Sequence, residues 1–100
     1  MIGSVDQVKK AERIKERINA EFDRIAHALE SSAANQAGQD RMDIEAVIVI
    51  LEEKRVELMA KVQADYFINS WREVNNRVRE LVAQDSRYLA INTRKALRQR

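Results

Sequence analysis

The sequence predicts an all-α fold, in which a long helical hairpin is followed by a C-terminal helix. Proline is absent, and the only two glycines are Gly3 and Gly38. Proline breaks helices and glycine weakens them, so long stretches without either residue favour uninterrupted helices. Apolar residues also recur at three- and four-residue steps, the spacing of one helix face. We therefore expect a single helical domain over residues 1–100, built as a three-helix bundle or a coiled-coil-like arrangement.

The composition predicts a soluble chain that needs a partner. Apolar residues make up 45% of the 100 residues and charged residues 34%, which is too apolar for a disordered chain. No apolar run approaches the length of about 18 residues that suggests a membrane span, so we expect no contact with a membrane. A domain of this size buries only a modest part of its surface when it folds alone. We expect oligomerisation, most simply a homodimer, to complete the bundle.

The first helix is expected over residues 5–31. Ser4 and Gln7 have the spacing of a capping box, in which each side chain hydrogen-bonds to the backbone of the other residue. Asp6 adds a negative charge at the positive end of the helix dipole. Apolar residues then recur at helical spacing and form one stripe, which consists of Val8, Ala11, Ile18, Phe22, Ile25 and Leu29.

Residues 32–40 are expected to form the loop of the hairpin. They are small and polar and include no large apolar side chain that could be buried. Asp40 is a suitable N-cap residue, because its carboxylate can accept hydrogen bonds from the first free amides of a helix. The second helix should therefore begin at residue 41.

The run 46–51 is apolar throughout and contains four consecutive β-branched residues. Such a run could be a buried strand, but its flanks are charged and no second strand-like segment is present for pairing. We therefore interpret it as helical. Six helical residues pass through more than one full turn, so this stretch is apolar on every side. It should be covered by the first helix and by either the C-terminal helix or a second subunit.

The second helix is expected to continue over residues 41–84, with an alternative break near 69–70. A continuous helix is favoured because apolar residues at 67, 71, 74, 78 and 81 keep a 4-3-4-3 spacing, which is typical of a coiled-coil seam. A second capping-box match, Ser70 with Glu73, favours the break. The residues expected to contact a partner or a second copy are Val47, Ile48, Ile50, Leu51, Phe67, Trp71, Val74, Val78 and Leu81.

The C-terminal segment is basic. Residues 1–68 carry a net charge of −3 and residues 69–100 a net charge of +5, and no acid follows Asp85. A last helix is expected over residues 86–98, with a short apolar stripe at Leu89, Thr93 and Ala96 or Leu97. The cations of this segment form a predicted basic arm, which consists of Arg87, Arg94, Lys95, Arg98 and Arg100.

The sequence contains no pattern of residues that predicts catalysis. Cysteine is absent, and the serines lie at capping or loop positions without a nearby base. His27 is the only histidine, and with Asp23 and Glu30 it would make a poor metal site on a solvated helix face. Two isolated glycines cannot form a phosphate-binding loop. We expect a protein that is not an enzyme and that carries no cofactor and no metal.

The predicted function is therefore contact with another protein. A non-catalytic helical module, such as a small adaptor, chaperone, neutraliser or assembly subunit, would present apolar helix faces to a protein partner. In size and helicity the chain is similar to the short helical-hairpin chaperones and filament subunits of bacterial secretion systems, although no motif is matched. The alternative is a nucleic-acid-binding protein that uses the basic arm on phosphates. Residues 1–6 show no secretory signal, so we expect a cytoplasmic location, with signal-independent export left open.

Overall fold

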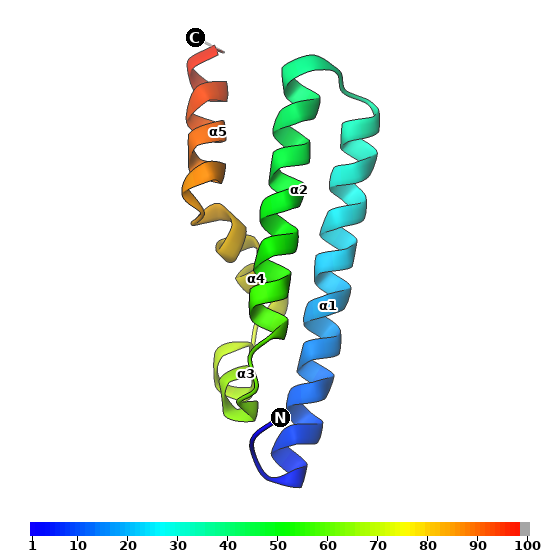
Figure 1. Cartoon of the computed structure of the whole chain (residues 1–100), viewed down its shortest axis with the longest axis vertical. Coiled ribbons are helices and arrows are strands. Elements are labelled where there is room, and N and C mark those ends of the chain that lie inside the picture. The colour runs from blue at the N-terminus through cyan, green and yellow to red at the C-terminus, as the bar shows by residue number, and fades with distance from the viewer. Residues whose placement is uncertain (99–100) are drawn as a thin grey trace.

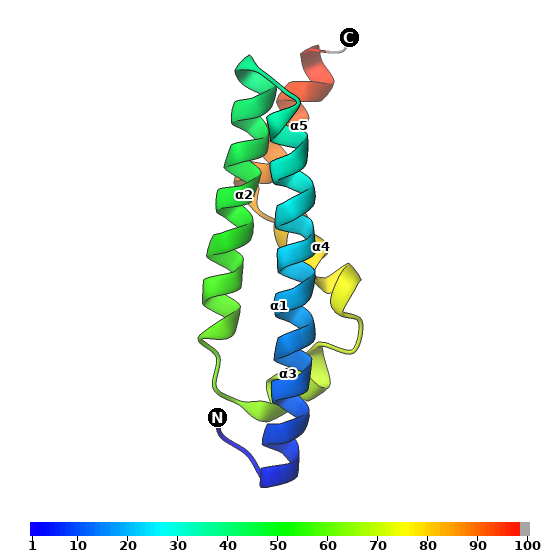
Figure 2. The same cartoon turned by 90° about the vertical axis from the view of Figure 1, so that its right-hand side faces the viewer.

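A computed structural model describes residues 1–98 of the chain. These residues form five helices and no sheet, which confirms the all-α prediction. The helices are α1 (Val5–Ala34), α2 (Gly38–Met59), α3 (Ala64–Ser70), α4 (Val74–Ala83) and α5 (Ser86–Arg98). The molecule is elongated, with extents of 53 × 23 × 19 Å. Helices α1 and α2 run side by side as a hairpin, and the shorter helices return along it (Figures 1 and 2). Within this part of the chain, none of the helices combines the length and the apolar character that crossing a membrane requires.

The predicted capping box begins α1. The Gln7 backbone amide donates to Ser4 Oγ at 3.2 Å, and the Ser4 amide donates to Gln7 Oε1 at 2.9 Å. At the other end α1 continues to Ala34, so the connection to α2 consists of residues 35–37 and is much shorter than the predicted loop over 32–40. Alanine has the highest helix propensity, and Ala33 is buried, which together favour this extension.

Helix α2 begins earlier than predicted, and Asp40 is not its N-cap. The helix starts at Gly38, whose φ of 60° lies in the left-handed region that glycine adopts without strain. The N-cap residue is Ala37, which offers no capping side chain. Asp40 lies in the first turn instead, where its charge still meets the positive end of the helix dipole. A glycine at the turn therefore sets the start of α2, and a capping side chain does not.

The long helix expected over 41–84 is divided into α2, α3 and α4. The chain leaves the helical conformation at residues 60–63, a break that no local signal predicted, and again at 71–73, close to the alternative break near 69–70. The predicted capping box at Ser70 does not form, since Ser70 ends α3 and Glu73 precedes α4 without a side-chain cap. A continuous helix would extend past the end of α1. The two breaks instead turn the chain back, so that α3 and α4 pack on α1.

The core lies between α1 and the elements that surround it. Its largest fully buried side chains come from four helices and one link, and they are Trp71, Phe22, Phe67, Ile18, Ile50, Leu51 and Val78. Two cations cover aromatic rings at the edge of this core: Arg55 lies 5.4 Å from the Phe22 ring centroid, and Lys15 lies 5.4 Å from that of Phe67. The core is therefore formed within one chain.

The N-terminus is attached to the α2–α3 link. The Ile2 amide donates to the Val62 carbonyl at 2.6 Å, and the Ala64 amide donates to the Ile2 carbonyl at 2.9 Å. Gly3 makes this approach possible, because a Cβ at this position would lie 2.9 Å from the Cβ of Ala64. The φ of Gly3 is 151°, which also favours glycine. The turn at 60–63 is thus stabilised by residues at the opposite end of the sequence.

Helix α5 packs on α2 and α4, and it differs from the rest of the bundle because none of its residues is buried. The apolar stripe predicted for this helix faces solvent, with Leu89 53% and Leu97 63% exposed. Tyr88 and Ile91 are half-buried instead, on the side toward α2. The prediction that this stripe forms the docked face of α5 is therefore wrong.

We predict that replacing a core aromatic residue will destabilise the whole fold. Phe22→Ala should lower the free energy of unfolding by about 3–5 kcal/mol, because Phe22 is fully buried and the cavity cannot close completely. Urea denaturation followed by circular dichroism measures this change. The exposed Leu97→Ala is the control and should change the same quantity by less than about 0.5 kcal/mol. Similar losses in the two variants would contradict a core at Phe22.

Candidate protein-binding cleft beneath the C-terminal helix

An apolar cleft of about 380 Å³ lies between α5 and the hairpin. Its floor is formed by α2, with Ile44, Val47 and Leu51, and one wall is formed by Ile25 and Leu29 of α1. The opposite wall comes from α4 and α5 and consists of Arg79, Val82, Ala83, Tyr88, Ile91, Asn92 and Lys95. Four helices, α1, α2, α4 and α5, thus surround one apolar space.

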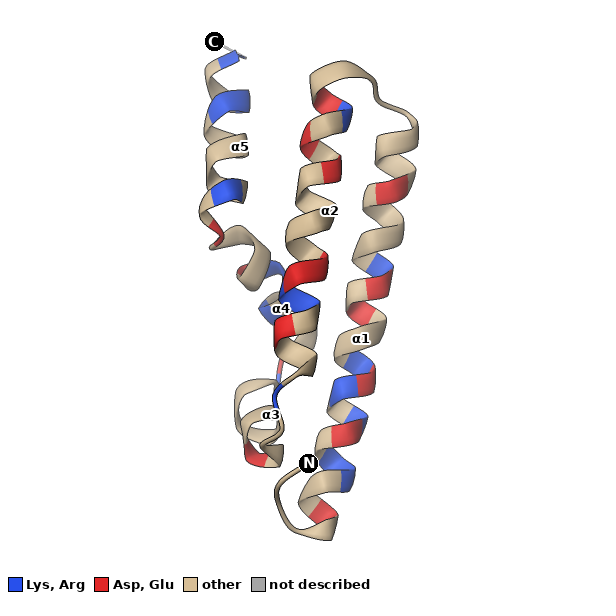
Figure 3. Cartoon of the chain, in the orientation of Figure 1, with Lys and Arg blue, Asp and Glu red and all other residues tan. Residues whose placement is uncertain are grey.

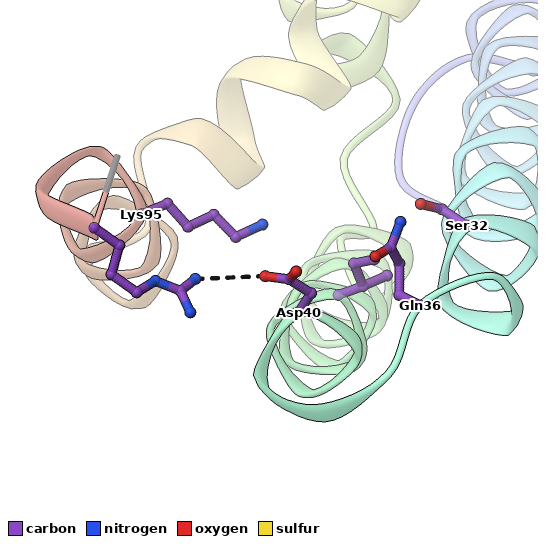
Figure 4. Close-up of a pocket in the computed structure, with 6 residues that line it drawn as sticks. Ser32, Gln36, Asp40 and Lys95 are labelled. Carbon is purple, nitrogen blue, oxygen red and sulfur yellow. Dashed lines mark hydrogen bonds and ion pairs between the residues drawn. The ribbon is translucent and has the colours of Figure 1, made fainter. Parts of the chain in front are cut away.

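The cleft has a polar end near the hairpin turn. A second hollow of about 570 Å³ shares Ile44 and Lys95 with the cleft and is lined further by Ser32, Gln36, Asp40 and Arg98. Figure 4 shows Lys95 reaching from α5 toward Asp40 of α2, while Ser32 and Gln36 lie on the other side of Asp40. The Arg98 guanidinium is 3.4 Å from Asp40 Oδ1. An elongated ligand in the apolar part would therefore meet charges of both signs at this end.

Helix α5 is attached to α2 mainly through ion pairs. Asp43 of α2 takes part in two of them, with Arg94 and with Arg98. The Asp43 carboxylate is 3% exposed and accepts hydrogen bonds from Gln39 at 2.9 Å and from Arg94. Arg98 approaches its other oxygen at 3.5 Å. The Gln39 hydrogen bond and the Arg94 guanidinium hold the pKa of the Asp43 carboxyl below its usual value, although burial acts in the opposite direction.

A second group of ion pairs fixes the beginning of α5. Asp85 caps the helix by accepting from the Arg87 amide at 2.9 Å, and it also pairs with the Arg87 side chain at 3.0 Å and with Lys54 at 3.3 Å. These hydrogen bonds, those from Arg87 first, hold the pKa of the Asp85 carboxyl well below its usual range. Arg87 also reaches Glu53 of α2 at 2.6 Å and lowers the pKa of that carboxyl. Basic residues of α5 and acidic residues of α2 thus lie next to each other, as Figure 3 shows.

The residues predicted to contact a partner lie mostly inside the single chain. Ile50, Leu51, Phe67, Trp71, Val74 and Val78 are buried in the core, while Val47, Ile48 and Leu81 are half-buried. The heptad spacing did identify residues that are buried together, but α1 of the same chain covers them. Of the whole set, only Val47 and Leu51 line the cleft.

The predicted basic arm is largely engaged within the molecule. Arg87, Arg94 and Arg98 form the ion pairs described above, and Lys95 lies in the wall of the cleft. Arg100 lies outside the described residues. The charges of this segment therefore help to hold α5 on α2, and only part of their positive potential remains for an external anion.

Sequence reasoning missed Asp43, Tyr88 and Ile91 as residues of the site. A signal for Asp43 was present, because it precedes Val47 by four residues and Ile50 by seven, which places it on the inward face of α2. An acid on an apolar face indicates a buried cation partner. Tyr88 and Ile91 could not be recognised in the same way, since the more regular apolar spacing of α5 belongs to the exposed stripe.

The described residues do not assemble a cluster of metal ligands. Among residues 1–98, no three side chains of the His, Cys, Asp and Glu types lie where they could hold a metal ion. His27 is exposed, and Asp23 pairs with Arg55 at 2.7 Å. What the site offers is an apolar space with charged ends, which suits binding of another molecule.

We predict that the Asp43 carboxylate controls the docking of α5. Asp43→Asn should release part of the helix, because Arg94 and Arg98 lose the charge that attracts them. Hydrogen exchange at pH 7 should then speed up at least about tenfold in the amides of α5, while the amides of α2 remain protected. Asp40→Asn is the matched control and should have little effect, since Asp40 is exposed and, among residues 1–98, pairs only with Arg98. Unchanged exchange in Asp43→Asn would show that apolar contact alone holds α5.

We also predict that acid releases α5. The pKa values of Asp43, Glu53 and Asp85 are lowered in the docked state, so the ion pairs stabilise docking fully above the ordinary carboxyl pKa of about 4. That stabilisation is lost as the pH falls from about 4 through the lowered pKa values. The NMR signals of the Tyr88 ring, which is half-buried in the cleft, should move toward those of a solvated tyrosine in this range. Tyr66 is the reference ring, and an equal shift of both would indicate global unfolding.

The chain matches no protein-family model, no curated protein and no solved structure.

Proposed function

We propose that this protein is a non-catalytic binding module that takes an amphipathic helix of a protein partner into the cleft beneath α5. The observation that carries this proposal is the cleft itself, which is apolar, open to solvent and lined by α1, α2, α4 and α5. Its volume of about 380 Å³ lies within the range of ligand-binding clefts. A groove between helices accepts another helix through apolar side chains at positions i, i+3, i+4 and i+7.

The weak attachment of α5 supports the same function. No residue of α5 is buried, and two of its ion pairs to α2, Arg87 with Glu53 and Arg98 with Asp40, lie at exposed positions, so only Asp43 gives the helix a buried partner. Exposed ion pairs contribute little to stability and depend on salt. A helix held in this way can move outward to admit a ligand without disrupting the core, which lies between α1, α2, α3 and α4. The cleft can therefore widen from its volume in the free protein.

The charged residues around the cleft favour one orientation of a bound helix over the opposite orientation. Arg79 of α4 lines the cleft, and Asp40 lies with Lys95 and Arg98 in the hollow near the hairpin turn. A partner helix with acidic residues toward α4 would have complementary charges. Use of the basic arm on nucleic acid has less support, because Arg87, Arg94 and Arg98 already pair with acids of the same chain.

We predict that a cleft residue of α5 controls binding of helical peptides. A displayed library of amphipathic helices about 20 residues long, selected on the intact protein, should yield peptides with apolar residues at i, i+4 and i+7. Ile91→Glu should weaken the binding of these peptides at least about tenfold, because it places a charge in the apolar wall.

The matched control is Leu89→Glu, which makes the same kind of change on the exposed side of the same helix. This variant should bind the peptides as the original protein does. Equal losses in both variants would show that α5 as a whole has been disturbed. A selection that enriches no helical peptide, or peptides that bind Ile91→Glu equally well, would overturn the cleft as the binding site.

A further inference from the structure

We infer that the outer face of α2 docks into a basic groove on a second copy of this chain, in a head-to-tail contact. This contact uses surfaces other than the cleft and does not depend on the function proposed above. The two surfaces lie on different flanks of the molecule. In Figure 2, α2 lies to one side of α1 and the 71–73 link lies to the other.

The outer face of α2 is apolar and acidic. Met42, Val49 and Val56 recur at intervals of seven residues and are 61%, 54% and 69% exposed. Large apolar side chains that align along a helix at this interval form a continuous stripe, which is the seam of a helix-to-helix contact. Four exposed acids flank this stripe, and they are Glu45, Glu52, Glu53 and Glu57. Of the cations in α2, only Arg41 is exposed. A partner surface for this face should therefore be basic with an apolar centre.

The groove between α1 and the end of α3 has this character. It has a volume of about 510 Å³, and it is lined by the apolar residues Ile14, Ile68 and Trp71 and by the cations Lys10, Arg13, Arg17 and Arg72. No acid contributes to this lining. The four cations are exposed, and within residues 1–98 none of them forms an ion pair. The groove thus carries four cations without an ion pair among residues 1–98, whereas Arg87, Arg94 and Arg98 of the basic arm are paired.

Charged residues flank an apolar residue at the same sequence spacing on both surfaces. In α1, Ile14 follows Lys10 by four residues and precedes Arg17 by three, which places a cation on either side of an apolar residue. In α2, Val49 stands between Glu45 and Glu52 with the same steps of four and three. Seven residues of a helix span about 10.5 Å. Two carboxylates and two cations can therefore meet on either side of an apolar contact between Val49 and Ile14.

A symmetric contact between two α2 faces is less favourable. The acids beside Val49 would then oppose the same acids of the second copy, and like charges in a contact repel each other. The acids of α2 do have partners in the single chain: Glu45 pairs with Arg41, Glu52 with Arg55 and Glu53 with Arg87. Glu45 and Arg41 are both more than half exposed, so this pair can exchange for a new one at little cost. The charges favour the head-to-tail contact.

The proposal predicts self-association that weakens with salt. Sedimentation of the intact protein at concentrations up to about 0.5 mM should show species larger than a monomer, with the micromolar or weaker affinity expected for a small interface. Raising the ionic strength from about 0.05 M to about 0.5 M should lower the association constant at least about tenfold. A protein that stays monomeric at low salt over this concentration range would overturn the proposal.

Charge reversal identifies the two surfaces. Glu45→Lys with Glu52→Lys gives a basic α2 face, and Lys10→Glu with Arg17→Glu leaves a groove without net positive charge, because Arg13 and Arg72 remain. Neither variant should associate with itself. An equimolar mixture of the two variants should associate again, because the unchanged groove of the first variant then meets the unchanged α2 face of the second. Glu16→Lys with Glu30→Lys is the matched control, since both acids are exposed on α1 outside these surfaces. Circular dichroism checks that each variant folds.

The outcomes separate this contact from other kinds of association. Association of either reversed variant alone, or a mixture that remains monomeric, would overturn the pairing of α2 with the groove. Association that is lost only on Val49→Asp and is insensitive to both charge reversals would indicate a symmetric apolar contact, which also overturns the proposal. Capture of a mixed-sequence DNA duplex by the groove in place of a second copy would assign the cations to nucleic acid and would overturn the proposal as well.

Discussion

The structure depends on α1, which is the only helix that contacts α2, α3 and α4. Its apolar face runs from Ala11 to Ala26, and α2 can cover only one side of that face. The other side would remain exposed if the chain continued beyond α2 as one straight helix. The turn at residues 60–63 solves this problem, because it brings Phe67, Trp71 and Val78 back onto α1, where all three are buried. Burial of aromatic and branched residues therefore stabilises two breaks that the backbone alone would not make.

This constraint explains which parts of the fold the sequence could predict. The capping box at Ser4 and the helical period depend on neighbouring residues, so they could be recognised locally. The 4-3-4-3 spacing from Phe67 to Leu81 also predicted burial correctly for most of its members. It could not show that the partner was α1 of the same chain, nor that Trp71 would lie in a link between two helices. Helix propensity changes little at residues 60–63, and only tertiary packing favours a turn there.

Helix α5 is positioned mainly by ion pairs, whereas the other helices are held together by buried apolar side chains. Its cations at 87, 94 and 98 face acids of α2, and this alignment sets the rotation of the helix about its axis. The buried Asp43 carboxylate is the least replaceable of these partners, since its desolvation has to be offset by the charges around it. As a consequence, Leu89 and Leu97 face solvent and the space beneath α5 is incompletely filled. The candidate cleft is thus a direct result of ion pairs that orient a helix with two different faces.

The cleft, the outer face of α2 and the basic groove share no residue, so each can bind independently of the others. The cleft is lined by inward residues of α2 such as Val47, whereas the proposed self-contact uses the outward residues Val49 and Val56 of the same helix. The run 46–51 is apolar on every side. Its inner residues complete the core, its flank contributes to the floor of the cleft, and its exposed edge belongs to the stripe that we propose for a second copy. Copies joined head to tail would each keep an open cleft. Such a series would present several clefts to a partner, and simultaneous binding would then raise the avidity well above that of a single cleft.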